Sequence, residues 1–312
     1  MSGLSYLQIR TPKEDETPIE ATTQIFSSLL PSSTKWYKVI LKKQVGYSFE
    51  IYLLGQRIYF YIATPTAKET FVKSLVASSF PSSAIVKTKD PLDLVLKSPY
   101  IATGEAVLTG SFYLPIKTFA EFKGVDPLAS LVGFLAKGST NQRAVIQILT
   151  TPATFPWQKA ANKLANPAPS TVEGEKPAVV PGRALIGQKT AYQGGKALVR
   201  ILVGSEGPEA ATFMDHLIGT FGAFAAGEGN QFKLKKPSDK KSFVIRVKER
   251  STNFFEHRSQ IMNSAELTTL WHPPGIMLAG VKNIAWGKTL AGEPPENIPI
   301  PESLTEEEKK RR

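Results

Sequence analysis

The sequence predicts an α+β fold with antiparallel sheets, ferredoxin-like βαββαβ organisation and two related α/β sandwich units. Runs of β-branched and aromatic residues typical of half-buried strands recur along the 312 residues. Amphipathic segments with helix-capping residues alternate with these runs. A hydrophobic content of 42% is ordinary for a protein with a buried core, so disorder throughout is not expected.

The first predicted unit covers residues 1–98 and contains an aromatic-rich hairpin. Thr17 is expected to cap a helix with Pro18 at its first position and Glu20 at its third. The predicted strands cover 35–43, 47–54 and 57–64, with a tight turn over 54–57; a helix over 66–79, capped by Thr66, and a short strand over 83–90 follow.

The second predicted unit covers residues 99–262 and carries the βαββαβ order. A helix around 157–164 and a proline-rich segment near 166–184, interpreted as a mobile insertion, interrupt that order. Residues 242–251 are interpreted as one more strand, because "FVIRV" alternates apolar and polar residues. The six elements of the order are strand 105–114, helix 126–137, strands 143–150 and 189–203, helix 208–224 and strand 230–236.

The third predicted region, 263–312, combines a short helix capped by Ser264 with an extended, proline-rich tail. His272-Pro273-Pro274 is expected to end the helix, because proline cannot continue one. The tail, interpreted over residues 290–312, is also rich in charge.

The composition of the chain argues against several classes of functional site. The chain has no cysteine, which excludes disulfides, zinc–thiolate sites, iron–sulfur clusters and thiol nucleophiles. Its three histidines are far apart, and neither a second histidine nor a carboxylate stands at metal-binding spacing, so no metal or other cofactor is predicted. No apolar run approaches the roughly 18 residues of a membrane helix, and no secretion signal is apparent. A cytoplasmic location is therefore expected.

The sequence also lacks the common catalytic motifs, and the chain is predicted not to be an enzyme. A phosphate-binding P-loop requires a glycine five residues before its Gly-Lys-Ser/Thr. Gly287-Lys288-Thr289 has Lys282 at that place and is rejected. No Gly-x-Ser-x-Gly elbow is present. An unrecognised hydrolase with scattered catalytic residues stays open as a minor alternative.

The charged segment 230–258 is the candidate binding site. It has nine Lys/Arg against three Asp/Glu, a net charge of +6 out of +11 for the chain. Lysines that follow a phosphate backbone, mixed with aromatic rings that stack on bases, are typical of single-stranded nucleic-acid binding. A solvated β-hairpin whose phenylalanines face the core is the favoured alternative. The candidate contacts for nucleic acid or an acidic partner are Lys233, Lys235, Lys236, Lys240, Lys241, Arg246, Lys248, Arg250, Phe254 and Phe255.

Several segments in order resemble one bacterial family. "RSQIMNSAELTTLWHPPG" and "VKNIAWGKTLAGEPPENIP", at 258–275 and 281–299, resemble the region before the motor of conjugative DNA-transfer, type IV secretion-like ATPases. "LQIRTPKEDETPIEATTQIFSSL" from Leu7, the segment 48–86 with its "SFPSSA" turn, and "DPLASLVGFLAKGSTNQRAVIQILTTP" from Asp126 resemble the same proteins. The resemblance runs over most of residues 4–300 and stops before any motor domain.

The resemblance implies a non-catalytic accessory or docking domain of a DNA-transfer apparatus, near the inner face of the cytoplasmic membrane. Its expected partners are a motor ATPase or another secretion-apparatus protein, with self-association and single-stranded DNA as further partners. It supplies no catalytic residues, because the Walker motifs belong to the motor. The expected docking segment comprises Leu267, Leu270, Trp271, His272, Pro273, Pro274 and Trp286.

Overall fold

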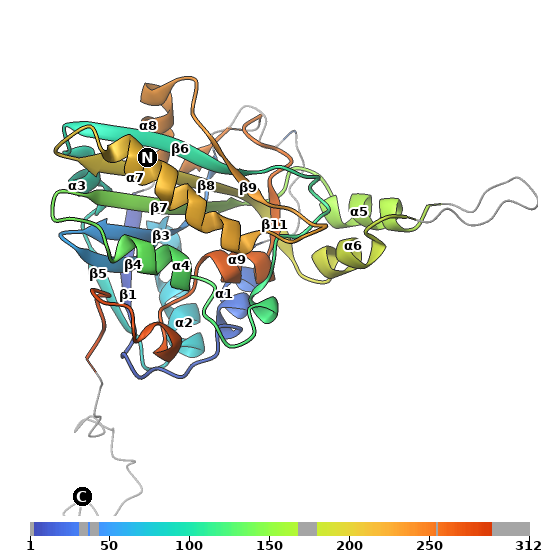
Figure 1. Ribbon diagram of the computed structural model, residues 1–312. Helices are drawn as coiled ribbons and strands as arrows, with labels where there is room; N and C mark the ends of the chain where they lie inside the picture. The colour runs from blue at the N-terminus through green and yellow to red at the C-terminus, as the bar shows by residue number, and fades with distance from the viewer. Residues whose placement is uncertain (1–2, 31–36, 38–43, 168–179, 254, 289–312) are drawn as a thin grey trace, which may run out of the picture.

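A nine-stranded antiparallel sheet forms the centre of the protein (Figure 1). The computed structural model describes residues 3–30, 37, 44–167, 180–253 and 255–288. Eight strands follow one another in the order β5-β1-β4-β3-β7-β8-β6-β9, and β11 pairs with β8. The strands are β1 (Leu4–Arg10), β3 (Tyr47–Leu54), β4 (Arg57–Pro65), β5 (Ala84–Thr88), β6 (Tyr100–Leu108), β7 (Arg143–Thr151), β8 (Gly194–Ser205), β9 (Phe232–Lys235) and β11 (Ile261–Asn263). A separate ladder joins β2 (Gln44–Val45) to β10 (Ser251–Thr252).

The two halves of the chain contribute four strands each in the same spatial order. Read from the outer edge inward, the first half contributes β5-β1-β4-β3 and the second contributes β9-β6-β8-β7. If the strands of each half are numbered one to four along the chain, both halves have the order four, one, three, two. The halves meet where β3 pairs with β7, and Glu50 lies opposite Gln147 in that ladder. The predicted α+β class with an antiparallel sheet is confirmed, and both halves share one continuous sheet.

One face of the sheet, called the helix face below, is covered by α-helices among the described residues. Alternate strand residues such as Ile51, Ile146 and Ile201 point to it, as the two-residue period of a strand requires. The covering helices are α1 (Ala21–Leu29), α2 (Glu69–Ser79), α4 (Ala129–Leu135), α7 (Ala210–Gly219) and α9 (Ser264–Leu270).

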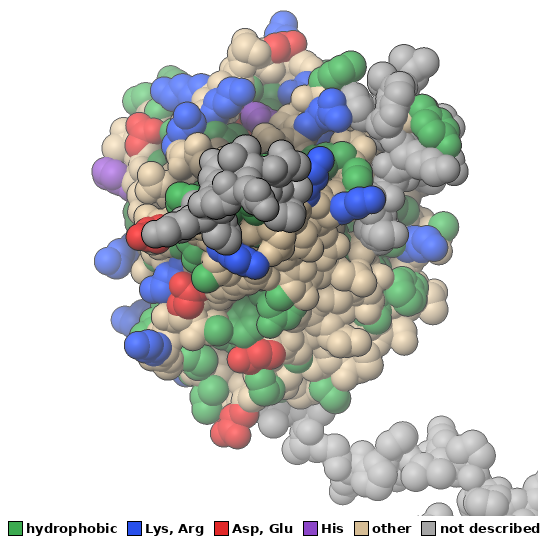
Figure 2. Space-filling model, turned by 90° about the vertical axis from the view of Figure 1, so that its right-hand side faces the viewer, with side chains coloured by type: hydrophobic (Ala, Val, Ile, Leu, Met, Phe, Trp, Pro, Cys, Tyr) green, Lys and Arg blue, Asp and Glu red, His purple; other side chains and the backbone are tan. Residues whose placement is uncertain are grey.

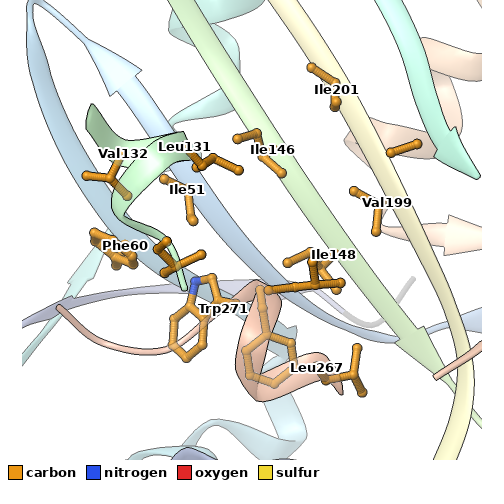
Figure 3. Packing of buried hydrophobic residues seen from close by; sticks show 14 of the residues in the cluster. Ile51, Phe60, Leu131, Val132, Ile146, Ile148, Val199, Ile201, Leu267 and Trp271 are labelled. Carbon is orange, nitrogen blue, oxygen red and sulfur yellow. The ribbon is translucent and has the colours of Figure 1, made fainter. Parts of the chain in front are cut away.

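Trp271 lies at the centre of the helix-face core, between the sheet and the helices (Figure 3). Its ring centroid is 5.1 Å from that of Phe49 and 6.4 Å from that of Phe60. The indole Nε1 donates a hydrogen bond of 3.3 Å to the backbone oxygen of Glu50. Burying so large a ring with its polar atom satisfied holds the segment after α9 against the middle of the sheet.

The opposite face, called the charged face below, is covered by α3 (Leu92–Leu96) and α8 (Lys240–Lys248). Its apolar cluster is smaller and is built around Tyr52, Val145 and Phe243. Ionised side chains fill much of the remaining buried space. Beside the sheet, α5 (Trp157–Ala165) packs against α6 (Arg183–Thr190).

Most local predictions from the sequence agree with the structure. The strand predicted over 47–54 is β3, and the turn before β4 places Gly55 and Gln56 at positive φ, as a two-residue hairpin loop requires. The helix predicted from Pro18 becomes regular only at Ala21, and the predicted caps Thr17 and Thr66 were wrong, because neither side chain bonds to a helix N-terminus. Asn263, and not Ser264, caps α9 through a capping box with Glu266.

Three strand predictions were wrong in type or in bounds. Residues 242–248, predicted as the main part of a strand, lie in α8: the Asp239 side chain accepts from the Ser242 N–H, and Phe243 and Val247 bury one side of the helix. The strand predicted from residue 189 starts at 194, because 183–190 form α6, and the strand predicted to 114 ends at 108. The predicted strand over 35–43 apart from Tyr37, the insertion core 168–179 and the tail 290–312 lie outside the described residues.

Candidate functional site

The lysines predicted as contact residues are exposed together on one surface. β9 carries Lys233 and Lys235, and the chain that leaves it carries Lys236. The first turn of α8 adds Lys240 and Lys241. These five residues are called the lysine surface below. Figure 2 shows Lys and Arg side chains gathered at the top of the molecule, the level at which α8 stands in Figure 1.

The two arginines predicted as contact residues form ion pairs with carboxylates of the same chain. Arg250 was expected on a binding surface, but its side chain is 0% exposed. Arg246 is one quarter exposed, and its Nε lies 3.3 Å from a carboxylate oxygen of Glu256. Lys248 is exposed and lies 3.2 Å from Asp93. The prediction for Arg250 was wrong, because two distant carboxylates bind its guanidinium group.

The aromatic residues of the segment are divided between core and surface. Phe243 is fully buried, and Phe232 packs edge-on against Phe221 at 5.5 Å. Phe255 is 73% exposed, whereas Phe254 lies outside the described residues. Most of the Phe255 side chain is thus at the surface.

Arg250 is the centre of a buried cluster on the charged face. Its Nε donates to Glu50 at 2.9 Å and its Nη2 donates to Asp90 at 2.8 Å. The hydroxyls of Ser48 and Tyr52 each donate to Glu50 at 2.6 Å. Burial raises the pKa of the Glu50 carboxyl, but the Arg250 guanidinium and the two hydroxyls outweigh burial and hold that pKa below its ordinary value.

A second buried cation lies on β8, which is separated from the Glu50 strand β3 by β7. Arg200 on β8 donates from Nη2 to Glu256 at 2.9 Å and to the Ser251 backbone oxygen at 3.0 Å. Next to it, burial lowers the pKa of Lys196 to about 8, and its ammonium donates to the Asn253 oxygen. These bonds tie the segment that follows α8 to the sheet.

The predicted docking segment forms part of the core. Leu267, Leu270 and Trp271 pack against the sheet, and Trp286 is half-buried against the same cluster. His272 is 1% exposed. Pro273 and Pro274 are buried as well. These side chains stabilise the fold and are covered in this structure.

A hollow of about 420 Å³ lies beside His272 and is called the His272 hollow below. Exposed apolar side chains surround it: Val125 is 57% exposed, and Ile276 and Met277 are each 46% exposed. At its base, His272 Nε2 is 3.1 Å from a carboxylate oxygen of Asp126. Burial lowers the pKa of His272, but Asp126 and the Thr268 carbonyl oxygen outweigh burial, so the pKa lies above its ordinary value.

Sequence reasoning missed these buried pairs because their partners are distant in the chain. Glu50 and Arg250 are 200 residues apart, and Asp126 and His272 are 146 apart. Lys189 and Glu266, a fully buried pair at 2.6 Å, are 77 apart. No local spacing signals such a pair. Within the described residues, no group of three potential metal ligands occurs, and no helix is long and apolar enough to cross a membrane.

Comparison with known proteins gave one family. The family is described as a domain of unknown function, DUF8128, and its profile matches residues 3–283. None of the curated proteins compared with the chain matches it significantly. The matched range takes in the whole sheet, the charged face and the His272 hollow.

Proposed function

Because the chain belongs to the DUF8128 family of unknown function, we propose a role for it from its sequence and surface: a non-catalytic docking domain of a conjugation or type IV secretion-like DNA-transfer apparatus, which contacts a motor ATPase. The resemblance of 258–275 and 281–299 to the pre-motor region of such ATPases motivates the proposal. Self-association into a ring is part of it. The site of action is the inner face of the cytoplasmic membrane, reached through partners.

The His272 hollow is the observation that carries this proposal. The segment 258–275, which resembles a pre-motor region, lines the hollow with His272, Pro273 and Gly275, and Ile276 and Met277 follow directly. The chain then passes the start of β4 and the end of β1, where the Gly287 N–H donates to the Thr11 backbone oxygen. Scattered exposed apolar residues are normal, but Val125, Ile276 and Met277 gather around one concavity. An apolar centre with a polar rim, here Glu16 and other charged residues, is typical of protein interfaces.

The test is co-purification with a motor ATPase of the same cell under gentle crosslinking. Ile276→Glu with Met277→Glu is expected to abolish recovery of the motor, since a charge cannot be buried in an apolar contact without a partner. Leu94→Glu is the matched control, because Leu94 is 47% exposed on α3. Recovery of the domain alone, or equal recovery of the motor with all variants, would overturn the proposal.

We also infer that each half of the chain is a ferredoxin-like unit. The repeated strand order supports this, since each half runs βαββαβ with its fourth strand beside its first. In the second half, α4 and α7 lie on the same face, where Phe134 and Phe213 are 4.8 Å apart. In the first half, α1 and α2 likewise cover the helix face.

Binding of single-stranded nucleic acid is the second candidate function. The lysine surface favours it, since its five lysines are exposed and Lys235 lines the same hollow as the exposed ring of Phe255. Affinity should fall steeply with salt, because bound counterions are released. Fluorescence anisotropy with single-stranded DNA tests this. Absence of binding at low salt, or unchanged binding when Lys235, Lys236, Lys240 and Lys241 become Glu, would rule it out.

A further inference from the structure

Strand β6 has one edge that is only half covered. It pairs with β8 over Tyr100–Ala106, but with β9 only over Glu105–Leu108. β9 ends at Lys235, and Pro237 then directs the chain toward the Asp239 cap of α8. Among the described residues, no strand pairs with the β9 side of β6 before Glu105.

The open stretch presents backbone groups toward solvent. The Ile101 oxygen accepts a 2.6 Å hydrogen bond from the Lys240 ammonium, which shows that this carbonyl points away from β8. Backbone groups of alternate residues in a strand point to the same side. Ile101 and Thr103 therefore direct their N–H and C=O groups to the open edge, in line with the groups of Glu105 that face β9.

A groove of about 490 Å³ lies along this edge and is called the edge groove below. One wall is the first part of α7, where Ala210, Ala211 and Met214 are small or apolar. The other wall carries Lys236 and Lys240. Asp215 on α7 is the acidic residue of the lining. The groove has an apolar wall, a cationic wall and, at its floor, β6 backbone that pairs with no other described strand on this side.

We propose that the edge groove binds an extended acidic segment of a partner protein, which adds a strand to β6 at Ile101–Thr103. Exposed sheet edges accept such segments through main-chain hydrogen bonds, while alternate side chains give specificity. In the bound strand, one set of side chains faces Ala210 and Met214 and is apolar. The other set faces Lys236 and Lys240 and is acidic, so the recognised pattern alternates apolar and acidic residues.

Charge decides which occupant fits. Lysines on an edge strand also protect against pairing with like-charged edges. A second copy that paired through the same edge would bring its own Lys236 and Lys240 to it, and the like charges would repel. An acidic strand is attracted instead, and its carboxylates can take over the ammonium of Lys240 when the Ile101 oxygen accepts a backbone N–H. This site is separate from the His272 hollow and does not depend on the docking proposal.

Fluorescence anisotropy of the full chain with a labelled Val-Glu-Val-Glu-Val-Glu peptide tests the proposal. Thr103→Pro removes one outward N–H and is expected to weaken binding at least tenfold, whereas Thr103→Val keeps the N–H and binding. Lys240→Ala is expected to weaken binding several-fold. Lys241→Ala is the matched control, because Lys241 is exposed on the same turn but does not line the groove.

Two peptide controls keep the test independent of protein folding. A peptide with N-methylated backbone amides keeps its charges but cannot pair as a strand, so binding equal to that of the parent would overturn the proposal. A block peptide, Val-Val-Val-Glu-Glu-Glu, is expected to bind more weakly than the alternating one. Single-stranded DNA that binds more tightly than the peptide, with no effect of Thr103→Pro on either, would assign the surface to nucleic acid.

Discussion

The helix face of the sheet is filled by aliphatic and aromatic side chains around Trp271. The charged face instead buries ion pairs, in which Arg250 bonds to Glu50 and Arg200 bonds to Glu256. Both faces are closed to solvent by helices. On the helix face, each apolar contact adds a small stabilising free energy that does not depend on direction, because apolar surface is removed from water. On the charged face, each buried ion depends on a specific partner at hydrogen-bond distance.

This difference assigns different tasks to the two faces. Apolar packing tolerates small changes and supplies most of the free energy of folding. A buried ion pair adds little net stability, but it penalises any arrangement in which a partner is missing. Arg250 bonds to residues of the first half from the segment that follows α8. The charged face therefore fixes where α8, with Lys240 and Lys241 in its first turn, lies on the sheet.

The largest expected effect is the loss of Arg250. Arg250→Met is expected to lower the free energy of unfolding by roughly 3–5 kcal/mol, because buried Glu50 is left without its cation. Asp90 loses the same partner, which places the effect toward the upper end. Urea unfolding measures it. The double variant Glu50→Leu with Arg250→Met is expected to recover much of the loss, and a double variant no more stable than the single one would contradict this account.

The matched change on the helix face is Trp271→Ala. It is expected to cost about 3 kcal/mol or more, since a large buried ring is replaced by a cavity. Trp271→Phe should keep most of the stability. Urea unfolding of both variants gives the comparison with Arg250→Met. If Trp271→Ala cost less than about 1 kcal/mol, the ring could not be the centre of the helix-face core.

The helix face could be predicted from the sequence far better than the charged face. The strand run from Tyr47 and the hairpin at Gly55 are local signals, because side-chain period and turn chemistry need only neighbouring residues. The segment from Phe243 to Val247 was misassigned because "FVIRV" satisfies both a strand and one side of a helix, and only the Asp239 cap distinguishes them. The pairing of Arg250 with Glu50 leaves no local signal at all.

Acid titration separates the two faces further. The Glu50 pKa is lowered in the folded protein, so its stabilising contribution is present above its ordinary value near 4.5 and is lost as pH falls through the folded pKa. Glu50→Gln is expected to be less stable than the wild type at pH 6, by a margin that shrinks steadily below about pH 4.5. Urea unfolding from pH 6 to 3 measures the margin. A margin that stayed constant across this range would show that Glu50 does not titrate with a lowered pKa.

The smallest expected effect on stability comes from the titration of His272, at the higher end of the pH range. The pKa of His272 is raised in the folded protein, so its stabilising contribution is fully present below its ordinary value near 6.5 and is lost as pH rises through the folded pKa. The wild type should therefore lose stability relative to His272→Gln as pH rises above about 6.5, because neutral imidazole no longer pairs as a cation with Asp126. Nuclear magnetic resonance of the ring protons gives the pKa directly.

The same titration tests whether a partner binds at the His272 hollow. Since His272 forms the base of the hollow, a ligand that stabilises the charged ring should raise the pKa of His272 further. If adding the partner left this pKa unchanged, the partner would bind elsewhere on the protein.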